Sequence, residues 1–220
     1  MFSNGRTITV KSEAKVEKAP DFVTITFSVR KTGATYTDAQ NEVEKMIQEI
    51  RRRFDKEKLG EDLIKTVNYK VKPQYEFVQG LLASPVHRLA GYMCEHQMKT
   101  EIKLDLNKVS CIVGILSGKI EDPQIQIIFS IKDMDAIYEK LLQEATVKAK
   151  KKAEIMCQAA GAKLGKLLTI SYDWIGKDMF ETSLLNYNEI SKVNDMEPQI
   201  ELYPMEIQVK DTATFVWEIE

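Results

Sequence analysis

The stretch Asp133–Gly165, DMDAIYEKLLQEATVKAKKKAEIMCQAAGAKLG, decides the fold that this chain can adopt. It predicts one long helix, because no glycine or proline lies between Asp133, a good N-cap residue, and Gly161, a good helix-ending residue. Small and apolar side chains recur every four residues and mark one face; they are Ile137, Leu141, Ala145, Ala149, Ala153 and Cys157. Leu142, Ile155 and Met156 are expected to widen that face. Its alanines predict close packing against a flat partner.

Alternation of apolar and polar residues with period two predicts strands on both sides of the long helix. Residues 8–17 and 23–30 alternate in this way around a turn signal at Pro20, so we expect them to form an antiparallel hairpin. Residues 92–106 form the longest alternating run, which predicts a bend, a bulge or a projecting arm. Residues 207–219 predict a long closing strand.

Two further helices are expected between the strands. Thr37 with Gln40 three residues later fits a capping box that opens the first, and Asn107 is expected to cap the second. Strands that follow one another, with helices grouped between them, predict an α+β fold. Its sheet is mainly antiparallel, with helices packed on one face. We expect residues 1–220 to form a single domain.

Composition narrows the class of protein. The net charge of −2 over 220 residues argues against a general nucleic-acid-binding protein, although Lys148 and Lys150–Lys152 cluster on the helix. We interpret these lysines as a solvated face, and a nucleic-acid or acidic-lipid contact is the lesser alternative. No apolar run is long enough to cross a bilayer, and the N-terminus has no signal-peptide core. The expected location is cytoplasmic, or periplasmic or extracytoplasmic if a leader was removed.

Cys94 and His96 are the one pair of soft ligands that lie close together. Positions i and i+2 of a strand point the same way, so the two could bind a metal or act as nucleophile and base. A metal needs a third ligand, and no second Cys/His pair exists, so we favour a core cysteine beside a hydrogen-bonded histidine. Three scattered cysteines predict no disulfide framework. No motif predicts a cofactor or a metal.

A polar, acidic stretch at residues 177–204 is long for a connection and predicts a flexible or protruding insertion. Trp174, Phe180 and Tyr187 lie in or beside it. A groove between this stretch and the sheet could hold a small molecule or a peptide, and these three aromatic residues would be its ligand contacts.

Three segments of the chain resemble the SIMPL-domain family: AKVEKAPDFVTITFSV, EATVKAKKKAEIMCQAAGAKLGKLLTIS and PMEIQVKDTATFVWEIE. Their order and spacing extend the resemblance over nearly the whole chain. The family includes bacterial oxidative-stress-defence proteins and periplasmic immunogenic proteins. The resemblance implies an α+β domain with an antiparallel sheet backed by helices, and homo-oligomers in some relatives. It implies no catalytic residue.

Three functions remain open from the sequence. The leading hypothesis is a non-enzymatic protein that assembles with itself, with a stress-related role implied by the resemblance alone. The alternative is a small-molecule or peptide-binding module that uses Trp174, Phe180 and Tyr187. The lesser alternative is an enzyme or metal site at Cys94 and His96.

Overall fold

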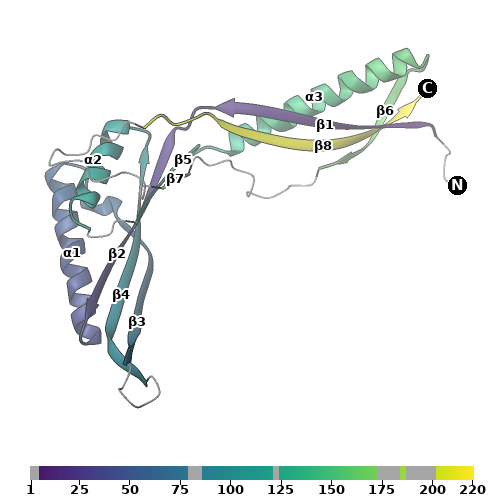
Figure 1. Ribbon diagram of the computed structural model, residues 1–220. Helices are drawn as coiled ribbons and strands as arrows, with labels where there is room; N and C mark the ends of the chain where they lie inside the picture. The colour runs from purple at the N-terminus through teal and green to yellow at the C-terminus, as the bar shows by residue number, and fades with distance from the viewer. Residues whose placement is uncertain (1–4, 79–85, 121–123, 173–183, 187–201) are drawn as a thin grey trace. The chain divides into compact units, whose positions relative to one another are not determined.

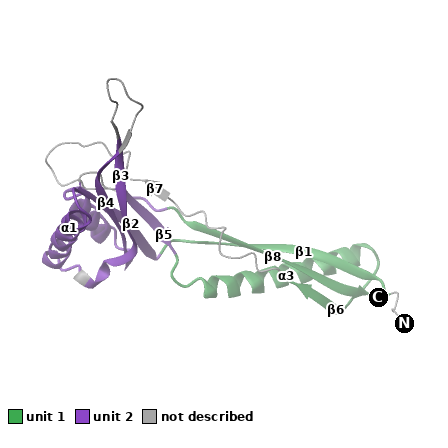
Figure 2. Ribbon diagram, turned by 90° about the horizontal axis from the view of Figure 1, so that it is seen from below, with its two compact units in different colours: residues 1–20, 131–182, 205–220 green, residues 21–130, 183–204 purple. Residues whose placement is uncertain are grey.

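The computed structural model describes residues 5–78, 86–120, 124–172, 184–186 and 202–220. The chain divides into two compact units (Figure 2). Unit 1 contains residues 1–20, 131–182 and 205–220, and unit 2 contains residues 21–130 and 183–204. The single domain expected over residues 1–220 stays a prediction.

Unit 1 is a three-stranded antiparallel sheet with one helix on it (Figure 1). Its strands are β1 (Thr7–Lys18), β6 (Leu164–Ser171) and β8 (Ile207–Ile219), in the order β1-β8-β6. β8 is the predicted closing strand and lies in the centre. All twelve residues of β1 pair with β8 without a register shift, from Thr7 opposite Glu218 to Lys18 opposite Ile207.

Helix α3 (Asp135–Ala159) packs against β1 and β8. The face predicted from the sequence is confirmed, and all six of its residues from Ile137 to Cys157 are buried. Its alanines allow the close approach, since Ala145 packs with Ala14 and Val209, and Ala149 with Val10 and Phe215.

Two details of the helix prediction were wrong. Ile155 and Met156 are 56% and 54% exposed, because one sheet can bury only one narrow stripe of the helix. The helix begins at Asp135 rather than directly after Asp133, although Asp133 Oδ1 still accepts a hydrogen bond from Ala136 N at 3.3 Å. The expected ending residue Gly161 has a positive φ of 71°, as predicted.

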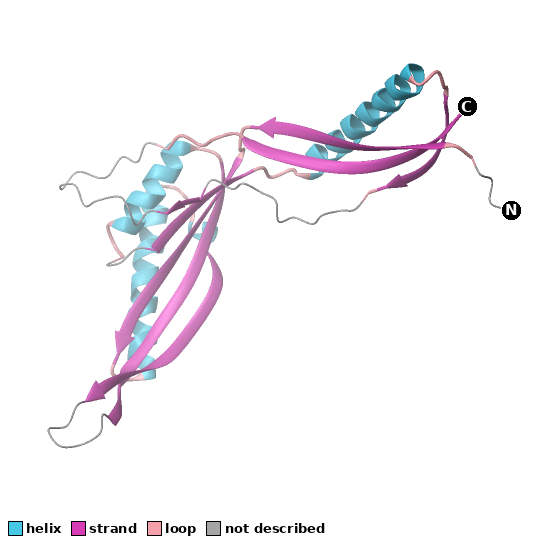
Figure 3. Ribbon diagram, turned by 45° about the vertical axis from the view of Figure 1, so that its right-hand side comes forward, coloured by secondary structure: helices cyan, strands magenta, loops and turns pink. Residues whose placement is uncertain are grey.

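Unit 2 is a five-stranded antiparallel sheet with the order β3-β4-β2-β5-β7. Its strands are β2 (Phe22–Gly33), β3 (Lys65–Val78), β4 (Val86–Lys103), β5 (Gln124–Ser130) and β7 (Leu184–Asn186). Helix α1 (Tyr36–Lys56) packs against β2 and β4, and α2 (Leu106–Ser117) packs against α1. A short 3₁₀ turn, η1, covers Glu61–Leu63. Figure 3 shows the helices and strands in separate colours. The α+β fold with antiparallel strands is confirmed.

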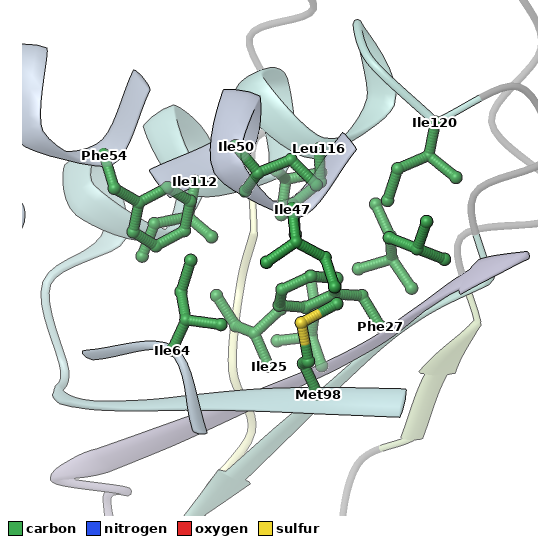
Figure 4. Packing of buried hydrophobic residues seen from close by; sticks show 14 of the residues in the cluster. Ile25, Phe27, Ile47, Ile50, Phe54, Ile64, Met98, Ile112, Leu116 and Ile120 are labelled. Atoms are coloured by element: carbon green, nitrogen blue, oxygen red, sulfur yellow. The ribbon is translucent and has the colours of Figure 1, made fainter. Parts of the chain in front are cut away.

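The core of unit 2 lies between its sheet and its two helices (Figure 4). Phe27 and Met98 from the sheet meet Ile47 and Ile50 of α1, and all four side chains are at most 2% exposed. α2 adds Leu116, which is fully buried. The alternation in β2 and β4 therefore places one face of each strand under the helices, as the period of two requires.

The predicted hairpin between residues 8–17 and 23–30 was wrong. β1 pairs with β8 in one sheet, and β2 pairs with β4 and β5 in the other. Asp21, which was expected to turn, stays extended: its N–H donates to Ser130 O at 3.1 Å and its C=O accepts from Leu104 N at 3.0 Å. Both backbone groups of Asp21 therefore bond to residues that adjoin or belong to the neighbouring strands β4 and β5, as those of a strand residue do.

The expected helix caps were also displaced. Thr35 rather than Thr37 caps α1, with a capping box to Asp38 in which Thr35 Oγ1 accepts from Asp38 N at 3.1 Å. Asp105 rather than Asn107 caps α2, and its carboxylate accepts from Lys108 N at 3.2 Å.

The long strand expected at residues 92–106 is β4, which begins earlier, at Val86. Its partner strand β3 runs to Val78. The β3–β4 register shifts between Gln74 and Tyr75, beside Gly91 with φ 151°, which is a bulge just before the predicted run 92–106 rather than within it.

The close contact of α3 with its sheet gives a first prediction. Replacing Ala149 with leucine should lower the free energy of unfolding by about 1–3 kcal/mol, because added methyl groups must enter a filled space between α3, Val10 and Phe215. Ala159→Leu on the exposed end of the same helix is the matched control and should change stability by about 0.5 kcal/mol or less. Urea unfolding followed by circular dichroism measures both, and equal losses would contradict the packing described.

Candidate functional site

Cys94 and His96 lie on the same face of β4, as the strand period predicted. This face is covered by α1, and it also carries Tyr92, whose ring meets Tyr36 of α1 edge to face at 6.3 Å. Cys94 is fully buried and His96 is half-buried. The structure therefore brings the predicted pair together, but beneath a helix rather than on an open surface.

His96 contacts the edge strand β3 through one ring nitrogen. Its Nε2 lies 2.8 Å from Thr66 Oγ1, and its ring meets the ring of Tyr69 edge to face at 5.1 Å. Its other nitrogen, Nδ1, is buried without a hydrogen-bond partner. Burial lowers the pKa of His96 below its usual 6.5, since the protonated ring would carry a second N–H with nothing to accept it. Glu44 opposes this shift and Arg51 adds to it.

Tyr69 links the cysteine to helix α1. Its hydroxyl accepts a hydrogen bond from Gln40 Nε2 at 2.9 Å and also contacts the thiol of Cys94. Burial, followed by the Cys94 contact, raises the pKa of the Tyr69 hydroxyl. Sequence reasoning missed Tyr69 and Thr66, because the period of a strand does not show that β3 lies beside β4.

The contacts of this cluster join β3 to β4 and α1, and they form neither a metal site nor a base–nucleophile pair. Across the described part of the chain, no group of three His, Cys, Asp or Glu residues could hold a metal ion. The side-chain hydrogen bond of His96 is made with Thr66 and not with Cys94, so the geometry does not form a base–nucleophile pair. The reactive pair stays a prediction that these contacts do not favour.

The expected ligand contacts Trp174, Phe180 and Tyr187 lie outside the described residues. Of the polar stretch 177–204, the described parts are β7, which pairs with β5, and residues 202–204. Leu202 packs against the core of unit 2.

A second polar cluster in unit 1 joins β6 to β8. The Tyr172 hydroxyl donates to Asp211 Oδ2 at 2.6 Å, and Asp211 Oδ1 accepts from the N–H of Thr212 at 2.7 Å. The bond to Asp211 raises the pKa of Tyr172 to about 12, and the same carboxylate, after burial, raises the pKa of Tyr138 on α3. Sequence reasoning missed this cluster, although Asp211 gave a signal for it, because its carboxylate interrupts the apolar alternation of β8.

β1 forms one open edge of the three-stranded sheet. Ile219 N donates to Arg6 O at 2.9 Å, and these residues continue the β1–β8 register. Because hydrogen-bonding direction alternates along an antiparallel strand, the even-numbered residues of β1 bond to β8. The odd-numbered residues, from Thr7 to Glu17, direct their N–H and C=O groups away from β8. Among the described residues, no strand pairs with them.

β6 forms the other edge of this sheet and is poorly covered. Leu167, Leu168 and Ile170 are 45%, 49% and 54% exposed. The pairing of β6 with β8 shifts register twice, between Leu164 and Leu167 and again before Thr169.

The edge strand β3 of unit 2 is different. It carries Lys70, Lys72 and Pro73 and has two register shifts against β4. Lysines, proline and bulges are the features by which natural edge strands avoid pairing with other chains. β1 also carries lysines, but it has no bulge and no proline within its twelve residues.

Comparison with known families identifies the chain. The family model SIMPL, described as a protein of unknown function (DUF541), matches residues 8–217. The chain belongs to the SIMPL family. The match confirms the resemblance drawn from the sequence and covers nearly the whole chain. No curated protein matches this SIMPL chain. In its described part, the SIMPL fold has no helix that is both long and apolar enough to cross a membrane.

The unpartnered nitrogen of His96 gives a second prediction. The pKa of His96 is lower in the folded protein than in the unfolded chain. The stability that the neutral His96 ring contributes to the folded protein is therefore complete above pH 6.5, and it is lost as the pH falls through the pKa of the folded state. Relative to the wild type, the variant His96→Asn should therefore lose less stability between pH 7.5 and 5. Urea unfolding at both pH values measures this difference. If the free energy of unfolding fell equally in the two proteins between pH 7.5 and 5, the pKa of His96 would not be lowered by folding.

Proposed function

We propose that this SIMPL protein is a non-enzymatic building block that assembles with copies of itself through the open edges of the unit 1 sheet. The observation that carries the proposal is β1, a twelve-residue edge strand that is regular along its whole length. Long, regular edges present unpaired N–H and C=O groups and are templates for pairing with another chain.

The uncovered side of β6 supports the same function. α3 covers β1 and β8, so Leu167, Leu168 and Ile170 stay exposed together on one strand. Large apolar side chains that stay exposed on one edge strand are the kind of surface that a partner chain can cover. The Tyr172–Asp211 hydrogen bond holds the end of this strand on the sheet, so its edge is presented in a fixed position.

Strand pairing also fits the absence of an assembled reactive site in the described part of the chain. Cys94 is buried beneath α1 and His96 is half-buried there, while the more exposed Tyr69 of β3 bonds to Gln40 of α1. Residues that only fasten strands and helices are what a structural subunit requires.

The third prediction tests assembly through β1. The N–H of Glu13 points to the open edge, so Glu13→Pro removes an edge donor without breaking a β1–β8 bond. In light scattering over a range of concentrations, the wild type should exceed the monomer mass of 25.2 kDa, and Glu13→Pro should lower the mass. Glu13→Gln keeps the N–H and is the matched control, expected to weaken assembly by no more than a few-fold.

A wild-type protein that stays monomeric at every concentration would overturn the proposed function. A Glu13→Pro variant that folds normally and assembles like the wild type would exclude the β1 edge. Circular dichroism melting of both variants separates a loss of assembly from a loss of folding.

A further inference from the structure

The exposed side of β1 carries charges of alternating sign. Lys11, Glu13, Lys15 and Glu17 follow one another at every second position, and all four are exposed. Within the chain, Lys15 Nζ lies 2.5 Å from Glu17 Oε1. The residue opposite Lys15 on β8 is Lys210, so β8 offers this lysine a like charge.

Backbone geometry restricts how two β1 strands can pair. The odd-numbered residues hold the free N–H and C=O groups, so odd residues must lie opposite odd residues of the second strand. For an antiparallel pair related by a two-fold axis, the axis must then pass through a residue position rather than between two residues. Shifting the axis by one residue changes which side chains face each other across the new edge.

The charged side chains of β1 make some of these registers more favourable than others. An axis at Glu13 places Lys11 opposite Lys15 and Glu13 opposite itself, and an axis at Lys15 places Glu13 opposite Glu17. Like charges directly opposite each other are destabilising. An axis at Ala14 places every charge opposite its counterpart, with Lys11 facing Glu17 and Glu13 facing Lys15.

The remaining registers satisfy fewer charges. An axis at Ser12 places Lys11 opposite Glu13 but leaves Lys15 opposite Thr9 and Glu17 opposite Thr7. An axis at Val16 joins Lys15 to Glu17 and leaves most of β1 unpaired. The Ala14 register is therefore the one in which all four charges of each copy are complemented.

We infer that two copies of this chain pair through β1, antiparallel about a two-fold axis at Ala14. The pairing joins two three-stranded sheets into one continuous sheet and adds about eight backbone hydrogen bonds, two for each of four residue pairs. This inference rests on the proposed function and names the partner and the register of its β1 edge.

The position of α3 is compatible with this pairing. α3 packs over both β1 and β8, so its axis lies roughly one strand spacing from the new two-fold axis. With strands about 4.8 Å apart, the two copies of α3 would lie about 10 Å apart, which is an ordinary distance between packed helices. Ala14, fully buried beneath α3, puts the smallest available side chain at the axis.

Charge exchange tests the register in the full chain. Lys15→Glu faces Glu13 of the second copy and should weaken dimerisation by about tenfold or more in sedimentation equilibrium. The double variant Glu13→Lys/Lys15→Glu restores opposite charges in the Ala14 register and should recover the wild-type dissociation constant within about threefold. With the axis at Ser12, the double variant would instead oppose Lys11 with a lysine, so rescue distinguishes the two registers.

Cross-linking provides a second readout. An equimolar mixture of Glu13→Cys and Lys15→Cys proteins should form a disulfide-linked dimer on mild oxidation, because these positions face each other at about 5.5 Å between Cα atoms. Each variant alone places its cysteines farther apart and should cross-link much less.

The outcomes separate this inference from the proposed function. A monomeric wild type overturns both. An assembled wild type that is unaffected by Lys15→Glu, or that cross-links Lys11→Cys with Glu13→Cys instead, overturns the Ala14 register and leaves self-assembly standing.

Discussion

The close contact between the alanine face of α3 and strands β1 and β8 is the constraint on which unit 1 depends. A helix is about 10 Å wide and neighbouring strands are about 4.8 Å apart, so one helix covers about two strands. α3 covers β1 and β8, and β6 keeps three apolar side chains exposed. The open, partly uncovered sheet follows from having three strands and one helix.

The sheet of unit 2 is covered more completely than the sheet of unit 1. Two helices cover its sheet, and its core includes large side chains such as Phe27, Phe54 and Phe129. Its outer strand β3 is held by polar contacts from Thr66 and Tyr69, and it is interrupted by a proline and two register shifts that β1 lacks. The two units therefore differ in the regularity of their edge strands.

The sequence predicted which face of a helix or strand is buried, but it did not predict which strands pair with one another. The period of four along α3 identified all six buried residues, and the period of two placed Cys94 and His96 on one face of β4. Neither period says which strand lies alongside, so the expected β1–β2 hairpin was wrong and Tyr69 was missed as the neighbour of Cys94. Such pairings depend on bulges and on residues far apart in sequence, as between Tyr172 and Asp211.

The connectivity of unit 1 has a consequence for synthesis on the ribosome. β1 is made first, but its sheet partner β8 is the last strand of the chain. At roughly 5–20 residues per second, β1 emerges at least several seconds before β8 exists. Residues 21–130, which contain most of unit 2, are complete in the meantime. During that interval β1 has no β8 to pair with, so the unit 1 sheet cannot form until β8 has emerged.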